Sequence, residues 1–331
     1  MARPKYHFTA KRGWINDPNG LVFLNGEYHL YFQHNPGGLV WGDMHWGHAV
    51  SRDLLHWEEL SIALYPKEND FCFSGSAIVD HENLAGFQTG SSPTLLVFYT
   101  STGRGECLVY SNDGGRTFRE YEDNPVVKHS GRDPKVIYHE ETRSWIMAVY
   151  DEVNYIAFYA SRDLKHWRFQ SRIHGFYECP ELFPLGERWV LMGANGCYSI
   201  GHFNGVTFEP ETLPCPLFHG DAYAAQTFSN LDNQRRILIA WMRSPNDVYE
   251  GESFCQQMTL PLELSLKGDR ILVNPAVRIP GAEVCSSPDR PLNIDGLTLP
   301  PAERITVIRD SLSVEAFLND GEAYYVKAVR R

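Results

Sequence analysis

The sequence lacks three features that would each point to a particular class of protein: a long apolar run, metal-binding spacings of cysteine or histidine, and an excess of basic residues. No run of about eighteen apolar residues is present, which argues against a membrane-spanning helix. The seven cysteines include no CxxC pair and the thirteen histidines no HExxH motif, so we expect neither a metal site nor a cofactor. The net charge of −11 argues against nucleic acid and anionic membranes as main partners, because both are polyanions.

The opening segment, MARPKYHFTAKRG, also lacks the apolar core of a signal peptide. Seven cysteines is an odd number, so at least one thiol stays unpaired. Both features favour the reducing cytoplasm as the location of the protein. A secreted chain whose signal has been removed looks the same, so secretion stays open as the alternative.

Apolar residues are plentiful: they make up 43% of the 331 residues, and aromatic residues make up 13%. This is enough for a large core without the help of metals or disulfides. Aromatic faces also stack on sugar rings, but most buried aromatics are core residues. Composition alone therefore predicts a globular protein and no particular function.

Three similar segments recur along the chain, with starts 60 and 50 residues apart. They are Ser51-Arg52-Asp53-Leu54-Leu55-His56-Trp57, Ser111-Asn112-Asp113-Gly114-Gly115-Arg116-Thr117-Phe118 and Ser161-Arg162-Asp163-Leu164-Lys165-His166-Trp167. Each follows a short β-type run and precedes another, so Asp-Leu or Asp-Gly forms the tip of a hairpin and the later aromatic packs beneath it. A repeating hairpin indicates a β-propeller, and a period of about 55 residues gives about five blades. Three coincidental turns in a β-sandwich are the alternative.

The rest of the sequence is rich in strand-like runs between Gly, Pro and Asn clusters, and poor in helix patterns. The clearest runs are Tyr28–Phe32, Leu95–Tyr99, Trp145–Val149, Trp189–Met192 and Ile237–Trp241. After Ile279 the prolines and serines predict an irregular connector, followed by a strand pair, Ser311–Phe317 and Ala323–Val329, around the turn Asn319-Asp320-Gly321. We therefore predict an all-β protein: a five-bladed propeller over residues 1–279 and a short C-terminal tail over residues 280–331.

Three acidic residues stand in turn-rich contexts that fit catalysis. Asp17 lies in Asn-Asp-Pro-Asn-Gly and Asp133 in Gly-Arg-Asp-Pro, each directly before a strand-like run. An ordinary turn and a surface Arg–Asp pair are the structural alternatives. Glu178 lies among Phe, Tyr, Cys and Pro, and an apolar setting raises a carboxyl pKa toward that of a general acid. Two carboxyl groups are the minimum for glycoside hydrolysis, so the residues permit a glycosidase without singling one out.

A series of motifs in order along the chain resembles glycoside hydrolase family 32, the family of invertases, inulinases and levanases. The motifs are Trp14-Ile15-Asn16-Asp17-Pro18-Asn19-Gly20, Tyr31-Phe32-Gln33-His34-Asn35-Pro36, Trp41 through Trp46-Gly47-His48-Ala49, the first repeat, Phe73-Ser74-Gly75-Ser76, Arg132-Asp133-Pro134, Glu178-Cys179-Pro180-Glu181-Leu182-Phe183, Tyr223-Ala224-Ala225-Gln226-Thr227-Phe228 and Met258-Thr259-Leu260-Pro261. The resemblance implies a five-bladed propeller and a retaining β-fructofuranosidase that acts on sucrose and short fructans.

The resemblance also implies a role for each matching residue. Asp17 would be the nucleophile that forms a fructosyl-enzyme, Glu178 the acid/base, and Asp133 the carboxylate that stabilises the transition state. Asn16, Gln33 and Ser74 match positions that hydrogen-bond the fructosyl unit, Trp41 and Phe73 match its apolar wall, and Arg132 helps to set the charge of Asp133. For a retaining enzyme, the carboxyls of Asp17 and Glu178 are expected about 5–5.5 Å apart. The expected partner is a small sugar, and no metal is needed.

The chain departs from the family pattern in three places. Most members carry a large C-terminal β-sandwich, whereas the tail here is short and resembles the end of that sandwich. The exposed propeller face would then meet solvent, a second copy of the chain or the tail itself, which leaves a homo-oligomer open. The other two departures, Leu217-Phe218-His219 and Arg243-Ser244-Pro245-Asn246, bear on the subsites for the leaving group and thus on the choice among sucrose, inulin and levan.

Three other functions stay open at this point. A fructosyltransferase would use the same site with a sugar in place of water. An inverting pentosidase on a related fold would need its carboxyls roughly 6.5–9.5 Å apart. A non-catalytic sugar-binding propeller would predict the loss of a catalytic carboxylate, and all three carboxylates are present in the sequence.

Overall fold

A computed structural model describes residues 3–231 and 235–330, which fold almost entirely into β-strands. Only the short 3₁₀ turns η2 (Asn246–Tyr249) and η3 (Asn319–Gly321) are helical in this part of the chain. None of the helices within these two ranges is long and apolar enough to cross a membrane.

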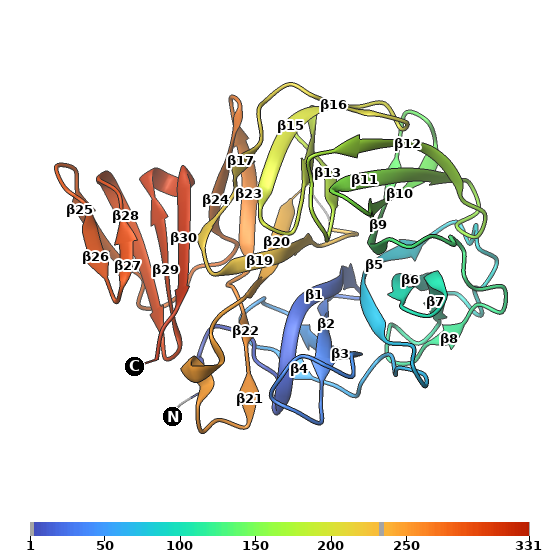
Figure 1. The fold of residues 1–331 in the computed structure, drawn as a ribbon, viewed down its shortest axis with the longest axis horizontal. Coiled ribbons are helices and arrows are strands. Elements are labelled where there is room, and N and C mark those ends of the chain that lie inside the picture. The colour runs from blue at the N-terminus through green and yellow to red at the C-terminus, as the bar shows by residue number, and fades with distance from the viewer. Residues whose placement is uncertain (1–2, 232–234, 331) are drawn as a thin grey trace.

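Five antiparallel sheets follow one another along the sequence and form the blades of a propeller (Figure 1). Blade one contains β1 (Gly13–Leu24), β2 (Glu27–Asn35), β3 (His45–Ser51) and β4 (Glu58–Glu59). Blade two contains β5 (Cys72–Asp80), β6 (Thr94–Ser101), β7 (Gly105–Ser111) and β8 (Arg119–Glu120). Blade three contains β9 (Arg132–His139), β10 (Ser144–Asp151), β11 (Tyr155–Ser161) and β12 (Arg168–His174).

The last two blades each add a short strand to the same plan. Blade four contains β13 (Glu181–Leu185), β14 (Arg188–Met192), β15 (Cys197–Phe203) and β16 (Phe208–Pro210), with β17 (Cys215–Pro216) beside β15. Blade five contains β19 (Ala222–Thr227), β20 (Arg236–Met242), β23 (Leu262–Lys267) and β24 (Arg270–Pro275), with β22 (Gln257–Met258) beside β20.

The first strand of each blade lies at the centre of the ring. Each of these strands contacts the first strand of the next blade, from β1 through β5, β9 and β13 to β19, and β19 contacts β1 in turn. The ring is also closed by β21 (Phe254–Cys255), which leaves blade five and pairs in parallel with β1. This arrangement confirms the predicted five-bladed propeller.

The three repeated segments form the turns between the third and fourth strands of blades one, two and three. In the first, the Ser51 hydroxyl accepts the N–H of Leu54 at 2.8 Å, and the Asp53 carboxylate accepts the N–H of His56 at 2.8 Å. The other two turns use the equivalent Ser and Asp residues in the same way. Leu54 has a φ of 67°, a conformation that the two hydrogen bonds hold in place.

The aromatic residue after each turn packs against the element that precedes its blade. The ring of Phe118 lies 5.8 Å from that of Tyr31 in blade one, and the ring of Trp167 lies 5.6 Å from that of Phe98 in blade two. Trp57 contacts Phe8 of the N-terminal segment at 6.1 Å. The repeat therefore joins neighbouring blades as well as closing a hairpin.

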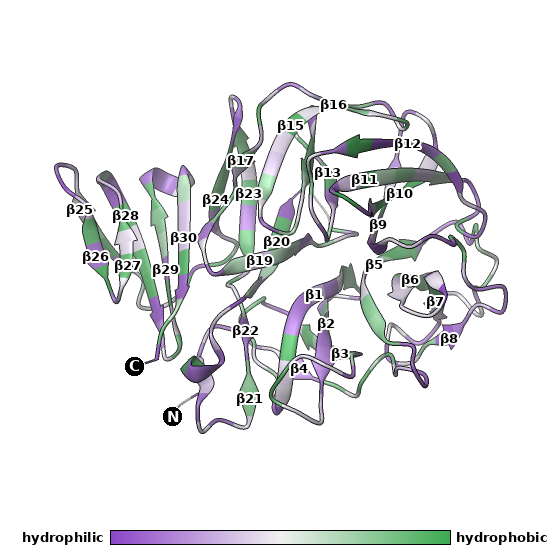
Figure 2. Ribbon diagram, viewed as in Figure 1, coloured by the Kyte–Doolittle hydropathy of each residue, from purple (hydrophilic) through white to green (hydrophobic). Residues whose placement is uncertain are grey.

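The second strands of the blades form the middle of the core. All five predicted runs fall on them, namely on β2, β6, β10, β14 and β20. They read as nearly continuous apolar sequences because each blade is covered by a neighbour on both faces; Leu95 to Phe98, for example, are fully buried. Figure 2 shows hydrophobic residues along the strands and hydrophilic residues in many of the connecting loops.

The C-terminal residues form a further sheet beside blade five (Figure 1). Its strands are β25 (Glu283–Ser287), β28 (Ala302–Asp310), β29 (Ser313–Leu318), β30 (Ala323–Ala328) and the propeller's own β18 (His219–Gly220), which pairs in parallel with β30. The hairpin β26 (Leu292–Ile294) and β27 (Leu297–Leu299) shares an apolar cluster with one face of the sheet, while side chains of the other face, such as Phe317 and Val326, share a cluster with blade five.

The sheet corrects one prediction and confirms another. The strand pair β29–β30 around residues 319–321 is present as predicted. The stretch from 280 to 310 is not an irregular connector, because it contains four strands. Its prolines stand between strands, where they end one and begin the next. The division of the chain at residue 279 stays a prediction.

Candidate active site

The first strands of four blades, β1, β5, β9 and β19, each contain a β-bulge. In each, one extra residue interrupts the pairing with the second strand, so that two consecutive residues oppose one. These pairs are Asn16-Asp17, Phe73-Ser74, Asp133-Pro134 and Ala224-Ala225. In blade four, Glu178 and Cys179 precede β13 with φ values of 49° and 37°. Bulges and left-handed residues re-aim side chains, and here they turn polar groups from several blades toward one place.

All nine predicted site residues line one cavity of about 380 Å³. This volume lies within the range of small-molecule sites. The predicted residues are Asn16, Asp17, Gln33, Trp41, Phe73, Ser74, Arg132, Asp133 and Glu178. A second cavity of about 480 Å³, between Asp80, Tyr138 and Arg236, contains none of them.

Asp17 is held by donors from two blades. Its carboxylate accepts the amide N–H of Asn16 at 3.1 Å and the hydroxyl of Ser74 at 2.6 Å. Trp14 fixes Asn16 through a 3.0 Å bond from its indole N–H. Burial raises the pKa of Asp17, and the bonds from Ser74 and Asn16 oppose this rise because they favour the charged form.

Asp133 is linked to Asp17 through the thiol of Cys179. The Cys179 thiol is 3.5 Å from a carboxylate oxygen of Asp133 and 3.5 Å from one of Asp17, so a single S–H group bridges the two. Burial, followed by the negative charge of Asp17, raises the pKa of Asp133 to about 7. Burial also raises the pKa of the Cys179 thiol well above its usual value, which keeps the thiol protonated and able to donate.

The carboxylate of Glu178 has several partners, and one of them, Arg132, also places its Nε 3.7 Å from the Asp133 carboxylate. One carboxylate oxygen bonds the guanidinium of Arg132, and the other accepts the hydroxyl of Tyr223 at 2.6 Å. Its side chain is 22% exposed. The apolar surroundings expected from the sequence are therefore wrong for its carboxylate, which is partly exposed and bonded to Arg132 and Tyr223. Phe176, by contrast, is buried in the core between blades three and four.

Aromatic rings form another part of the cavity wall. The indole of Trp41 is 52% exposed and meets the ring of Phe73 at 6.1 Å and that of Phe71 at 6.5 Å. Gln33 is buried opposite the bulge in β1 and donates to the Cys72 carbonyl at 2.9 Å. The cavity thus combines an apolar face with convergent polar groups, as sugar rings require.

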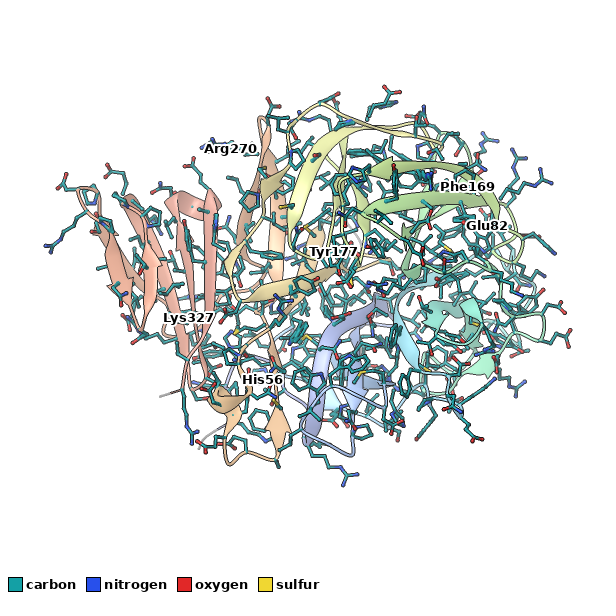
Figure 3. The ribbon with its side chains drawn as sticks, in the orientation of Figure 1. His56, Glu82, Phe169, Tyr177, Arg270 and Lys327 are labelled. Atoms are coloured by element: carbon teal, nitrogen blue, oxygen red, sulfur yellow. The ribbon has the colours of Figure 1, made fainter. Side chains whose placement is uncertain are left out.

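Five lining residues were not predicted to belong to the site: Tyr177, Cys179, Tyr223, Trp241 and Arg243. Tyr177 is 41% exposed and lies near the middle of the ring in Figure 3. Cys179 and Tyr223 lie in two of the motifs that resemble the family, so the signal for them was present. Arg243 lies in the segment Arg243-Ser244-Pro245-Asn246, whose departure from the family pattern pointed to the leaving-group subsites without singling out one residue.

No group of three or more His, Cys, Asp or Glu side chains in the described ranges is arranged to hold a metal ion. The prediction that the protein needs no metal or cofactor stays a prediction.

Comparison with known proteins places this geometry in a family. The family described as glycosyl hydrolases family 32, N-terminal domain, matches residues 7–275. The levanase of Bacillus subtilis is 39% identical over 317 residues, which cover 82% of this chain and 46% of the levanase. Invertase 2 of Saccharomyces cerevisiae is 39% identical over 280 residues, covering 72% of this chain and 53% of the invertase. The chain thus spans about half the length of the curated relatives it matches.

Solved structures agree with the fold. The β-fructofuranosidase from Schwanniomyces occidentalis, complexed with fructosyl-erythritol, superimposes with a TM-score of 0.86 at 25% identity, over 99% of this chain and 91% of that one. The exo-inulinase from Aspergillus awamori has a TM-score of 0.85 at 24% identity, over 99% and 92% of the two chains. Since the family match extends over residues 7–275 and the propeller is that of its solved structures, this chain belongs to glycoside hydrolase family 32.

Proposed function

We propose that this chain is a retaining β-fructofuranosidase, which hydrolyses terminal β-D-fructofuranosyl residues of sucrose and short fructans. The observation that supports this most directly is that Asp17, Asp133 and Glu178 line one cavity, where donors from neighbouring side chains hold each carboxylate. The names of the relatives, levanase and invertase, support the same substrate class.

Asp17 is suited to the role of nucleophile. The donors from Asn16 and Ser74 stabilise its carboxylate and fix the orientation of both oxygens. In the proposed first step, the carboxylate attacks the anomeric carbon of the fructosyl unit. The bond from that carbon to the glycosidic oxygen breaks, and a covalent fructosyl-enzyme forms.

Glu178 is suited to the role of acid and base. Its partly exposed carboxyl group faces the cavity, where the leaving group departs and water enters. In the first step it gives its proton to the glycosidic oxygen; in the second it takes a proton from the water that attacks the fructosyl-enzyme and releases Asp17. Tyr223 and Arg132 hold the carboxyl in place through both steps.

Asp133 and its neighbours are suited to binding the sugar. A carboxylate beside the oxocarbenium-like transition state stabilises its positive charge, and Asp133 also accepts fructosyl hydroxyls in this proposal. Asn16, Gln33, Ser74 and Arg132 supply further polar groups, while Trp41 and Phe73 form the apolar wall. A cytoplasmic location and self-association both stay predictions. The relative from Aspergillus niger is named extracellular exo-inulinase, so its name indicates a different location for that protein.

The test is the release of fructose and glucose from sucrose, 1-kestose, inulin and levan by the wild type, Asp17→Asn and Glu178→Gln. We expect fructose release by the wild type and a loss of about a thousandfold or more in kcat for both variants. A wild type that is inactive on every fructoside would overturn the proposal and favour a sugar-binding propeller. Oligosaccharide products at high sucrose would instead identify a fructosyltransferase on the same site.

A further inference from the structure

The side of the cavity that receives the leaving group follows from the roles proposed above. Asp17 attacks the anomeric carbon on one side while Glu178 protonates the glycosidic oxygen on the other, so the leaving sugar lies beside Glu178. The cavity residues grouped around Glu178 are Tyr177, which adjoins it in the chain, and Tyr223, which bonds its carboxylate. The residues that contact the leaving sugar must therefore come from this group and its neighbours.

Arg243 is the charged neighbour in that position. Its guanidinium carbon stands 4.4 Å from the centre of the Tyr223 ring, the same ring whose hydroxyl bonds Glu178. The side chain is exposed and lines the cavity. Arg132, by comparison, is engaged by Glu178. Within the described part of the chain, Arg243 forms no ion pair with a carboxylate, so its donors are free to meet a ligand.

The backbone of Arg243 is fixed by the C-terminal sheet through Asp221. The Arg243 N–H donates to the Asp221 carbonyl at 2.7 Å, and the Asp221 N–H donates to the Val326 carbonyl at 3.0 Å. The Asp221 carboxylate in turn accepts the N–H of Ala328 at 2.9 Å. Val326 and Ala328 belong to β30, which also pairs with β18 just before Asp221. A strand outside the propeller therefore sets the position of a residue at the rim of the cavity.

We propose that Arg243 binds the leaving sugar and determines leaving-group specificity, and that Asp221 is the positioning residue that ties it to the C-terminal sheet. This inference rests on the proposed function. The planar guanidinium offers several donors in one plane to sugar hydroxyls, and its contact with the Tyr223 ring restrains its position. The ligand class is a neutral glycosyl leaving group rich in hydroxyl acceptors, such as the glucosyl unit of sucrose or a second fructosyl unit.

The test compares substrates with and without a leaving sugar. Sucrose and 1-kestose carry one, whereas methyl β-D-fructofuranoside carries only a methyl group. For Arg243→Ala we expect KM for sucrose and 1-kestose to rise about tenfold or more, as the loss of one or two hydrogen bonds to a charged donor predicts. KM for the methyl fructoside should stay within about twofold of the wild type. The matched control is Arg172→Ala, because Arg172 is also exposed and also stands 4.4 Å from a tyrosine ring, that of Tyr155, outside the cavity.

The positioning role is tested in the same assay. Asp221→Ala removes the acceptor of the Ala328 N–H and should raise KM for sucrose without a matching change for the methyl fructoside. Asp221→Asn keeps an oxygen acceptor and should restore KM to near the wild-type value. Equal effects of Arg243→Ala on all substrates, or no effect on any, would overturn the inference while leaving the proposed function intact. A wild type that cleaves none of the three fructosides would overturn both.

Discussion

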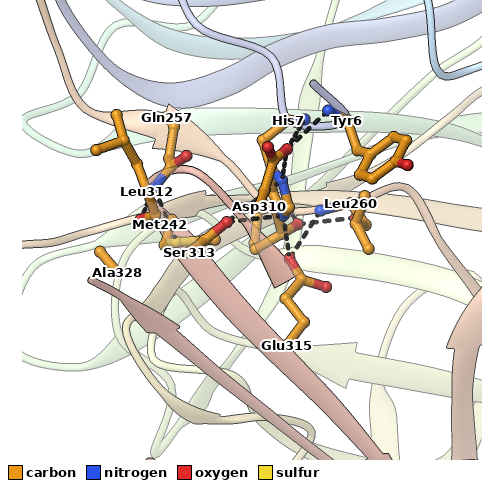
Figure 4. Close-up of polar contacts among 12 residues, drawn as sticks. Tyr6, His7, Met242, Gln257, Leu260, Asp310, Leu312, Ser313, Glu315 and Ala328 are labelled. Atoms are coloured by element: carbon orange, nitrogen blue, oxygen red, sulfur yellow. Dashed lines mark hydrogen bonds and ion pairs between the residues drawn. The ribbon is translucent and has the colours of Figure 1, made fainter. Parts of the chain in front are cut away.

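A buried histidine joins three parts of the molecule, and its removal gives a sharp prediction about stability. Figure 4 shows His7 of the N-terminal segment between two carboxylates of the C-terminal sheet: Nδ1 lies 2.9 Å from Asp310 and Nε2 lies 3.0 Å from Glu315. Glu315 also accepts the N–H of Leu260 in blade five at 3.0 Å. Ser313 contacts the same ring. The His7→Gln substitution removes the cation from this junction.

The magnitude follows from the pKa of His7. Burial alone lowers that pKa, but the bonds and charges of Asp310 and Glu315 raise it from 6.5 to about 9. A difference of this size corresponds to about 3 kcal/mol of the free energy of unfolding. Below pH 6.5 both the folded and the unfolded states carry the proton, so the contribution is complete. Between pH 6.5 and about 9 only the folded state keeps it, so stability falls as the pH rises, and above about 9 the contribution is gone.

The assay is urea unfolding at several values between pH 6 and 9.5. The wild type should lose about 3 kcal/mol over this range relative to His7→Gln, whose stability at pH 6 should already be lower by about 3–5 kcal/mol because two buried carboxylates lose their partner. The control is His56→Gln: His56 bonds Asp53 at 2.6 Å but its side chain is 84% exposed, so we expect a change below about 1 kcal/mol. Parallel losses in the wild type and His7→Gln would show that the proton on His7 does not stabilise the folded state.

Three further predictions concern the cavity and the core beneath it. Ser74→Ala removes a donor to the Asp17 carboxylate, so the pKa of Asp17 should rise further and the acidic limb of the kcat/KM profile should move up by about one pH unit; an unmoved limb in the pH–rate profile would contradict this. Lys135→Ala breaks the buried 2.9 Å ion pair with Glu181 and should cost about 3–5 kcal/mol in urea unfolding, part of which Glu181→Gln should restore in the double variant. Trp41→Ala should raise KM for sucrose several-fold and change the unfolding free energy by less than about 1 kcal/mol, because the ring is 52% exposed; a large loss of stability would show that the ring is structural.

Much of the fold could be predicted from the sequence because the patterns that indicate turns and strands lie within a few residues. The Ser-x-Asp turns make their own hydrogen bonds within a few residues, so their pattern predicts the hairpins wherever they stand. The second strands are apolar throughout because both faces are covered, and this too is visible in a short window. The C-terminal strands were harder to predict, since the prolines at 280, 288, 300 and 301 suggested irregular chain, whereas they stand between strands.

The site residues could also be predicted from local motifs, whereas their arrangement could not. The nine predicted residues lie in motifs, and the structure brings all of them to one cavity. The bulges that aim them depend on the register between neighbouring strands, which the sequence of one strand does not contain. The surroundings of Glu178 were predicted wrongly for a related reason: two of the partners of its carboxylate, Arg132 and Tyr223, come from blades three and five, far from Glu178 in the sequence.

The structure explains why the chain departs from the family pattern at Leu217-Phe218-His219. Leu217 and Phe218 are buried in the cluster between the propeller and the C-terminal sheet. His219 begins β18, and its ring stacks on Tyr325 of β30 at 4.6 Å. The segment therefore docks the C-terminal sheet onto the propeller, and through Asp221 it reaches the rim of the cavity.

The proposed function depends above all on a covalent fructosyl-enzyme at Asp17, and the configuration of a transfer product shows whether this intermediate forms. Sucrose is cleaved in aqueous methanol, and the anomer of the methyl fructofuranoside is identified by NMR before it is hydrolysed. Two displacements, by Asp17 and then by methanol, predict methyl β-D-fructofuranoside, which retains the configuration of the substrate. The α-anomer would show a single displacement and would rule out a fructosyl-enzyme at Asp17.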